Sequence, residues 1–494
     1  MAKKEKKKHV YPDNFRGYFG FCGMSVMSTI ATGLVGSYFA LYLTDYAGID
    51  SSWATIVAGI VLLVGRIVDA IDDPIQGWFM ESVKIGKSGK YKPFQILSIC
   101  MMGVALVGMY FMPDFLKHNR LLVILWMLFF YLIYDFGYSF DAQGPIQQAL
   151  TLDTRVRGNQ MFWGRLVAIG VGMTLSAFLK VYAVMKNAAG GSVSKGFGFT
   201  TIAYVAAGAV ISLLAVSFIK EQNVVKEEKE EKSEKVSFKE IISIFKNNHA
   251  LRTFFMTQLF HGFIYVFMMA ANVYYLKWTY FSVNGHVDDG ALGNMTLIMS
   301  AATFLVMFLS IGLARPLMNK LGPVKMLTIT TLCEATVGFV MFVLHILGIL
   351  QTSPYLFVGL FAIMYFFQGF AFIPMSIFRT ECIDYNAWTT GKEDGAIVMA
   401  GFKILDKGQN AIASTAALGV LTLFGYGVDE VTGDLLPSAL QHFTSMQTGM
   451  MVVIALVPAI CCVLAILFLQ KYPIQGEVRE QMYKELKERR GEAE

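Results

Sequence analysis

Three acidic residues and one basic residue interrupt an apolar run that is long enough to cross a membrane. The stretch "GRIVDAIDDPIQGW" carries Arg66, Asp69, Asp72 and Asp73. The acids are spaced i, i+3 and i+4, so on a helix they share one face, and Arg66 lies one turn earlier on that face. Because this group keeps a negative surplus, it must be protonated or bind a cation. The pattern favours a coupling-ion site over a structural charge network, which needs balanced pairs.

Two lysines stand in a similar apolar run near the C-terminus. In "FKILDKGQNA", Lys403 and Lys407 are four residues apart and share a helix face, with Asp406 beside them. A buried lysine can neutralise the acidic group of the earlier run when no cation is bound, or it can donate hydrogen bonds to a polar substrate. We expect Lys407 to take the first role and to act, with Arg66, as a charge partner of the cation site.

Polar side chains in two other apolar runs are candidates for substrate contact. Asp135 and Asp141 are six residues apart, so they do not share a helix face, and at most one can point at the cavity of the acidic group. Asp141 precedes "AQGPIQQAL", whose Gly-Pro pair can break the helix and open backbone groups to a cavity. The run that begins "NQMFWGRL" places Trp163 and Arg165 just inside the membrane.

Residues 250–278 combine amide, imidazole and aromatic groups, among them Gln258 and His261. Such a set suits a sugar, whose ring stacks on aromatic faces while its hydroxyls are hydrogen-bonded. The chain is 14% aromatic, however, and the aromatic belts at the two membrane surfaces account for most tyrosines and tryptophans. Ligand contact by any one of these residues stays open.

Long helices are needed to hold these side chains. The chain has 494 residues, of which 55% are hydrophobic and 16% charged, and its mean hydropathy is +0.52. A soluble protein of this size needs more polar surface, so we predict an all-α polytopic membrane protein. Apolar blocks of about twenty residues, each long enough to span a bilayer, recur along nearly the whole chain. We predict twelve transmembrane helices, at about 17–43, 54–80, 94–112, 121–149, 161–185, 199–219, 250–278, 292–313, 326–350, 355–377, 396–424 and 446–469.

The charges of the connections predict the orientation. Connections rich in lysine and arginine alternate with the connections 46–53, 279–291, 351–354 and 425–445, which contain neither residue. The positive-inside rule places the basic set, and with it both termini, in the cytoplasm. The opening "MAKKEKKKH" and the full-length first apolar block are not typical of a cleavable signal peptide. We therefore expect a multi-pass protein of the cell (plasma) membrane, surrounded by the lipid bilayer.

A long mixed-charge connection divides the chain into two sets of six predicted helices. We predict an N-terminal half over 1–219, a cytoplasmic linker over 220–249, a C-terminal half over 250–469 and a cytoplasmic tail over 470–494. Two six-helix halves with basic connections after their second helices are the organisation of the major facilitator superfamily. Transporters built from such repeats bind their substrates near the midplane, between the repeats.

Other functional classes are disfavoured. The sequence shows no combination of nucleophile, base and orienting residue and no nucleotide motif, so we do not expect an enzyme, a cofactor or a nucleic-acid partner. The six cysteines show no metal-ligand spacing, and most fall inside apolar blocks, which is typical of small packing residues.

Four segments, in matching order and spacing, resemble one family. They are "RIVDAIDDPIQGW", "TLDTRVRGNQMFWGR", "ECIDYNAWTTGKEDG" and "DKGQNAIAS". Together they resemble the glycoside–pentoside–hexuronide:cation symporters, the melibiose permease-like family of the major facilitator superfamily. The resemblance runs over the whole chain. It implies a twelve-helix fold and the symport of a sugar with Na⁺ or H⁺.

The resemblance also implies roles for single residues. Asp69 and Asp73 match the two acids of the family's cation site, and they would be the metal ligands if the ion is Na⁺. Asp72 falls where melibiose permease has an asparagine, and this third acid could favour a proton over Na⁺. Lys407 matches the lysine near the cation site, and Arg165 matches an arginine of the sugar site.

Departures from the family pattern bear on the substrate. In melibiose permease, an acid of the first helix and an acid of the fourth helix bind the sugar hydroxyls. The position of the first acid falls near Thr29 in this chain. The position of the second falls at or next to Phe140, with Asp141 as the nearest candidate. Lys403 stands where a small hydroxyl residue would be. The cavity thus loses at least one acid and gains a base, which hints at an anionic sugar such as a hexuronide, although a neutral glycoside or pentoside remains open. The predicted substrate-binding residues are Arg165, Asp141, Gln143, Trp163, Lys403 and Thr29.

These observations predict a cation-coupled sugar symporter that imports a glycoside, pentoside or hexuronide by alternating access. Binding of the cation at Asp69, Asp72 and Asp73 would relieve their mutual repulsion and favour the sugar-binding state. Two alternatives stay open: an uncoupled sugar facilitator, and a transporter-like receptor that senses sugar without moving it. The acid surplus speaks against the facilitator.

Overall fold

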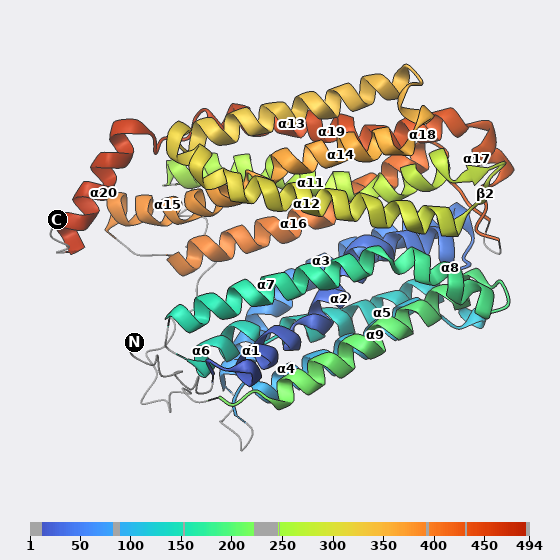
Figure 1. Cartoon of the computed structure of the whole chain (residues 1–494), viewed down its shortest axis with the longest axis horizontal. Helices are drawn as coiled ribbons and strands as arrows, with labels where there is room; N and C mark the ends of the chain where they lie inside the picture. The colour runs from blue at the N-terminus through green and yellow to red at the C-terminus, as the bar shows by residue number, and fades with distance from the viewer. Residues whose placement is uncertain are drawn as a thin grey trace, which may run out of the picture. The chain divides into compact units, whose positions relative to one another are not determined.

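The computed structural model describes residues 12–82, 89–151, 154–221, 246, 248–391, 395–429 and 432–490. The chain divides into two compact units (Figure 1). The first unit comprises Met1–Glu230 together with Asp289–Asn294 and Gly427–Leu436. The second comprises Glu231–Asp288, Met295–Tyr426 and Pro437–Glu494. Most of the predicted linker, 220–249, lies outside the described residues, so the predicted domain boundaries stay predictions.

Helices make up the first unit, which runs from blue to green in Figure 1. In chain order they are α1 (Phe15–Met24), α2 (Val26–Leu41), the π-helical η1 (Tyr42–Tyr46), α3 (Ser51–Ser82), α4 (Lys92–Tyr110), the short 3₁₀ turn η2 (Asp114–Leu116), α5 (Arg120–Ser139), α6 (Gln143–Leu150), α7 (Thr154–Ser176), α8 (Phe178–Ala188) and α9 (Val193–Ser217).

The second unit is also helical and runs from yellow-green to red in Figure 1. Its helices are α11 (His249–Tyr280), α12 (Asp289–Leu321), α13 (Pro323–Ile346), η3 (Leu350–Thr352), α14 (Pro354–Gly369), α15 (Phe372–Thr390), α16 (Gly395–Leu423), α17 (Pro437–Gln441), α18 (Phe443–Met451), η4 (Val452–Leu456), α19 (Val457–Leu469) and α20 (Gly476–Arg490). A hairpin of two-residue strands, β1 (Ser282–Val283) and β2 (His286–Val287), joins α11 to α12.

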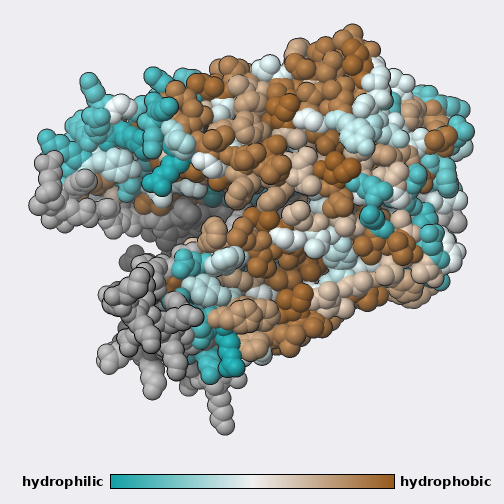
Figure 2. Space-filling model, in the orientation of Figure 1, coloured by the Kyte–Doolittle hydropathy of each residue, from teal (hydrophilic) through white to brown (hydrophobic). Residues whose placement is uncertain are grey.

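The helices have the length and composition of membrane spans. Within the described part of the chain, nine helices are long and apolar enough to cross a bilayer, or ten if the pair α7 and α8, bent by 44°, is one span. α3 and α16, of 32 and 29 residues, coincide with the two predicted spans that carry the charged groups. Each of the twelve predicted spans thus falls on one long helix or on adjoining helices. On the face in Figure 2, hydrophobic side chains cover the middle of each unit and hydrophilic ones gather toward the helix ends.

Asparagine side chains begin three of the long helices. The Asn14, Asn119 and Asn248 side chains accept hydrogen bonds from backbone N–H groups in the first turns of α1, α5 and α11. These N–H groups have no partner within the helix, so each cap contributes about 1 kcal/mol. Asn248 also donates to the backbone oxygen of Cys382 at 3.0 Å, which fixes the start of α11 against α15.

An aromatic cluster packs one end of the first unit. The ring of Phe197 in α9 lies 5.1 Å from that of Tyr42, 5.0 Å from that of Tyr46 and 5.7 Å from that of Tyr182, centroid to centroid. Tyr110 of α4 stacks on Phe197 at 5.6 Å. These rings join four elements that are distant in sequence, and such pairs contribute about 0.5–1.5 kcal/mol beyond their buried area.

The C-terminal helix α20 is held to α15 by a buried acid. Glu381 of α15 is fully buried; Arg479 Nη2 lies 2.7 Å from its Oε1, and the Tyr472 hydroxyl donates to its Oε2 at 3.1 Å. Further along α20, Glu485 accepts a hydrogen bond from the ring N–H of Trp388 in α15 at 2.7 Å. The predicted tail, 470–494, therefore contains a helix that packs on the second unit.

Arg479→Ala is expected to destabilise the second unit. Removing one partner of a fully buried ion pair costs about 3–5 kcal/mol. Because the Arg479 side chain is one-third exposed, we expect a smaller loss, of about 2–3 kcal/mol. The unfolding temperature of the protein in detergent measures this loss. Lys484→Ala removes an exposed base from the same helix and is the matched control; an equal effect of both variants would argue against the pair.

Candidate functional site

A cavity of about 470 Å³ opens inside the first unit. Three stretches of helix line it: α1 and α2, then α5 and α6, and finally α7. In each of the two helix pairs, one predicted span is broken into two helices. Such breaks expose polar backbone and side chains to a cavity in membrane transporters. The lining residues are Phe21, Ser25, Ser28, Thr29, Thr32, Tyr138, Asp141, Gln143, Gly144, Gln147, Met161, Gly164 and Ala168.

Asp141 stands in the break between α5 and α6. Its backbone N–H donates to Tyr138 at 2.9 Å, and its Oδ1 accepts from the Gln143 N–H at 3.3 Å. The next N–H, of Ala142, donates to the side-chain oxygen of Gln95, which is fully buried in α4. These bonds satisfy the backbone of the break and hold the Asp141 carboxylate at the cavity wall. The sequence predicts a break at the Gly-Pro pair; the structure has it earlier, and Pro145 lies in the first turn of α6, where its missing N–H costs nothing.

Hydroxyl groups of α2, and of Ser25 between α1 and α2, also line the cavity. Ser25 donates its hydroxyl proton to the backbone oxygen of Cys22, Ser28 and Thr29 donate theirs to that of Ser25, and Thr32 donates to that of Ser28. Each hydroxyl thus has a partner in its own helix, and its oxygen can accept a further hydrogen bond from a ligand. With the Asp141 carboxylate, these oxygens give the cavity several acceptors, which suits a ligand rich in hydroxyl donors.

Part of the predicted substrate site is gathered in this cavity. Thr29, Asp141 and Gln143 all line it. Trp163 of α7 does not: its side chain is 52% exposed and packs edge-on against Phe162. Asp135 is 2% exposed and also lies outside the lining, so the structure separates the two acids that the sequence left as alternatives.

The side chains of the other predicted residues lie outside the described part of the structure. These are Arg66, Asp69, Asp72 and Asp73 on α3, Arg165 on α7, and Lys403 and Lys407 on α16. The backbone of α3 is one continuous helix over Ser51–Ser82, so the three acids occupy one face by register. Among the side chains that are described, no three His, Cys, Asp or Glu residues gather as metal ligands. The predicted sodium ligands Asp69 and Asp73 therefore stay a prediction.

Gly65 fixes the position of α3 one residue before Arg66. A Cβ atom at Gly65 would lie 2.2 Å from Cε1 of the Tyr131 ring on α5, so only glycine permits this approach of the two helices. The segment that carries the acidic residues is thus anchored by close packing of α3 on α5.

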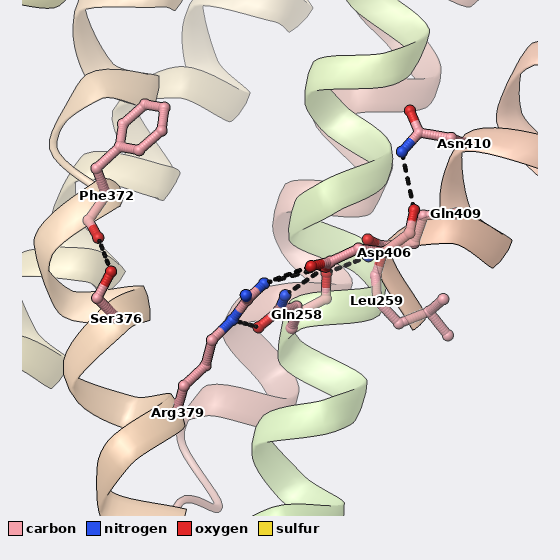
Figure 3. Close-up of polar contacts among 8 residues, drawn as sticks. All are labelled: Gln258, Leu259, Phe372, Ser376, Arg379, Asp406, Gln409 and Asn410. Atoms are coloured by element: carbon pink, nitrogen blue, oxygen red, sulfur yellow. Dashed lines mark hydrogen bonds and ion pairs between the residues drawn. The ribbon is translucent and has the colours of Figure 1, made fainter. Parts of the chain in front are cut away.

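A second cavity, of about 320 Å³, opens inside the second unit. Its wall holds an ion pair: Arg379 Nη2 lies 3.0 and 2.9 Å from the two carboxylate oxygens of Asp406 (Figure 3). Gln258 closes the network, because its Nε2 donates to Asp406 at 2.7 Å and its Oε1 accepts from Arg379 Nε at 3.1 Å. Gln409 donates to the backbone oxygens of Gln258 and Leu259, which ties α16 to α11.

Sequence reasoning missed most of this second site. Arg379 falls in the connection after the predicted span 355–377, but α15 continues to Thr390 and brings this residue to the cavity wall. Asp406 was noted only as a neighbour of two lysines. Gln258 and His261 were among the polar candidates of their helix, and both line the cavity. The signal that could have found the pair is an acid inside one apolar run and a base at the end of another.

The two cavities lie at corresponding places in the two sets of six helices. The first is lined by predicted spans one, four and five, and the second by predicted spans seven, ten and eleven. The fourth helix of each set is broken, at 140–142 between α5 and α6 and at 370–371 between α14 and α15. This correspondence is what an internal repeat produces.

The chain resembles known transport proteins over most of its length. The model of the family described as MFS/sugar transport protein matches residues 19–476. A lactose permease of Leuconostoc lactis is 23% identical over 83% of this chain, which spans only 63% of that protein's length. An uncharacterised symporter of Bacillus subtilis is 24% identical over 87% of this chain and 85% of its own. A glucuronide carrier protein homolog of Escherichia coli is 21% identical over 97% of this chain and 96% of its own.

The fold matches that of solved transporters. A bacterial homolog of the human lysosomal transporter Spinster, in an inward-facing and unoccupied conformation, aligns with a TM-score of 0.61 at 11% identity. The alignment covers 94% of this chain and 98% of the other. At this identity the likeness concerns the fold alone.

Proposed function

Because this chain belongs to the family of MFS/sugar transport proteins, a family of transporters rather than enzymes, we propose that it imports a sugar together with a cation. The sugar is a glycoside, pentoside or hexuronide, and the cation is Na⁺ or H⁺. Transport proceeds by alternating access of the two six-helix halves. The protein lies in the plasma membrane with both termini in the cytoplasm, as the charges of its connections favour.

The observation that carries this proposal is the chemistry of the first cavity. Asp141 and the hydroxyls of Ser25, Ser28, Thr29 and Thr32 offer hydrogen-bond acceptors in one cavity. A sugar presents hydroxyl donors around its ring and pairs with such acceptors, whereas an apolar solute would leave them unsatisfied. A cavity of about 470 Å³ also falls in the size range of small-molecule sites.

Coupling to a cation is proposed for the acids of α3. Asp69, Asp72 and Asp73 repel one another when all are ionised, and a bound cation or proton removes part of that repulsion. If the relieved state is the one that binds sugar, ion and sugar share one coupling free energy, and each raises the affinity for the other by the same factor. Lys407 and Arg66 would compensate the acids when no ion is bound.

The substrate is either a neutral sugar or an anionic one. The names of the relatives, a lactose permease and a glucuronide carrier protein homolog, cover a neutral and an anionic sugar. Asp141 at the cavity wall favours a neutral glycoside, because a sugar carboxylate beside it would be repelled. Lys403 and Arg165 would favour a hexuronide, through charge-assisted hydrogen bonds to its carboxylate.

Uptake into proteoliposomes tests the proposed function. Labelled lactose and a labelled glucuronide are offered to vesicles with an inward Na⁺ gradient, an inward H⁺ gradient or none. We expect one sugar under one gradient to accumulate above its outside concentration, and an ionophore that collapses the gradient to abolish the excess. Uptake that stops at equilibration would instead support the facilitator, and binding without uptake would support the receptor.

A further inference from the structure

A further acid stands inside a predicted span, in α13. Glu334 lies eleven residues into this 24-residue helix, and none of its surface is exposed. Among the described residues, no lysine, arginine or histidine forms an ion pair with it. The titratable groups that face it there are Tyr365 of α14 and Cys462 of α19, and both are normally uncharged at neutral pH. An acid without a cation in such a place is expensive to ionise.

The hydrogen-bond partner of Glu334 connects it to the second cavity. The amide of Gln368, at the end of α14, faces the carboxyl group: its nitrogen, when turned toward Glu334, donates to Oε1 at 2.9 Å and to Oε2 at 3.1 Å. Gln368 is 8% exposed and lines the cavity that holds Arg379, Asp406 and His261. One amide thus touches both the buried acid and the cavity.

Gln368 can form a hydrogen bond with Glu334 whether the acid is ionised or protonated. When the acid is ionised, it accepts from the Gln368 nitrogen. When it is protonated, its O–H donates to the Gln368 oxygen, which requires only that the amide turn by half a rotation. The two states leave opposite ends of the amide for the cavity: the oxygen, an acceptor, in the first state and the nitrogen, a donor, in the second.

A ring nitrogen without a partner lies in the wall of the same cavity. His261 of α11 is 5% exposed and lines the same wall, and its Nε2 has no hydrogen-bond partner within the described part of the structure. A buried ring nitrogen of this kind is satisfied by a ligand or by water. The polar surface that meets a bound molecule here therefore combines His261, the Gln258–Arg379–Asp406 network and the free end of Gln368.

We propose that Glu334 is a proton-binding site, and that its protonation sets, through the orientation of Gln368, whether the second cavity presents an amide donor or an acceptor. The site lies on α13 and α14 and shares no residue with the acids of α3. It binds H⁺ whichever ion the α3 acids take. Because its occupancy is measured without a transported substrate, a failure of this proposal is distinguishable from a failure of the proposed function.

Carbodiimide labelling of the full-length protein in lipid vesicles tests the site. Dicyclohexylcarbodiimide partitions into membranes and adds the O–H of a protonated carboxylic acid across one C=N bond. In a water-poor place the adduct rearranges to a stable N-acylurea, which peptide mass spectrometry locates. We expect labelling of Glu334 at neutral pH that falls as pH rises. Glu381 is the internal control: it is equally buried, but its ion pair with Arg479 favours the ionised form, so it should be labelled less than Glu334.

A second measurement detects the protonated acid without any reagent that must reach Glu334. The infrared spectrum of the wild type at neutral pH should contain the carbonyl band of a buried carboxylic acid, shifted in D₂O and missing in Glu334→Gln. Labelling at Glu334, or a band that this variant removes, supports the proton site. The proposal is overturned if Glu334 gives neither signal.

Gln368→Leu tests the link to the cavity. This change removes the bond to the ionised acid and the bond to the protonated acid. The bond to the ionised acid is charge-assisted and therefore the stronger of the two, so Glu334 should stay protonated in more alkaline solution. We expect the midpoint of labelling against pH to rise by about one unit, a tenfold change in proton concentration. Gln351→Leu replaces a glutamine of the second unit that bonds to His345 instead, and it is expected to leave the midpoint unchanged. A midpoint that does not move in Gln368→Leu would show that the amide does not report the proton.

Discussion

Asp73→Asn is expected to reduce gradient-driven uptake to simple equilibration. The substitution removes one of the three charges on the face of α3 that Asp69 begins, so a cation no longer gains by binding there. Without a bound ion there is no coupling free energy to drive sugar uphill. The measurement is the ratio of inside to outside sugar in proteoliposomes under the gradient that drives the wild type; we expect it to fall to about one.

Two further variants make this result specific. Asp114→Asn removes an exposed acid that pairs with Lys117 between α4 and α5, and it should leave accumulation unchanged. Asp72→Asn removes the extra carboxylate, and we expect it to keep coupling but to shift ion preference toward Na⁺. If Asp73→Asn accumulates sugar like the wild type, the acids of α3 are structural and the coupling site lies elsewhere.

Asp141→Ala is expected to weaken sugar binding about 10- to 100-fold. Hydrogen bonds to a charged acceptor contribute about 1.5–3 kcal/mol, and each 1.4 kcal/mol is a factor of ten in affinity. Asp141 is the carboxylate on the wall of the first cavity, and the break between α5 and α6 holds it there. Equilibrium binding of the sugar that the uptake assay identifies, measured at a saturating concentration of the coupling ion, gives the change directly.

Asp135→Asn is the matched control for this prediction. Asp135 lies in the same predicted span, is 2% exposed and does not line the cavity. Its replacement should lower the unfolding temperature rather than the affinity. Equal losses of affinity in both variants, or none in Asp141→Ala, would place the sugar outside this cavity.

The span pattern could be predicted from sequence because lipid imposes a simple rule. A helix must bury all its backbone polar groups over about 30 Å, so spans appear as apolar runs of about twenty residues. Helix breaks follow no such rule. The turn at 140–142 depends on Gln95 of α4, which accepts from Ala142 and is 47 residues away in sequence. Its position, and with it the choice of Asp141 over Asp135 at the cavity, is a tertiary property.

The role of a charged side chain near the end of a predicted span is also hard to predict from sequence. Arg379 is indistinguishable in sequence from the basic residues that set orientation, and only the continuation of α15 to Thr390 and the partner Asp406 give it a place in a cavity. Glu334 is the opposite case. It stands alone in the apolar run "TLCEATVGF", and the rule that intramembrane acids are functional could have marked it without a structure.

The corresponding cavities of the two halves have a consequence for how such a protein diversifies. Duplication of a six-helix ancestor with one polar pocket would give two identical pockets in one chain. The two pockets of this chain differ: the first offers hydroxyls and a carboxylate, and the second an ion pair and an imidazole. Drift in one copy is tolerated while the other keeps its role. New substrate ranges should therefore be obtainable by exchanging lining residues between the two cavities, for example those around Ser28 and His261.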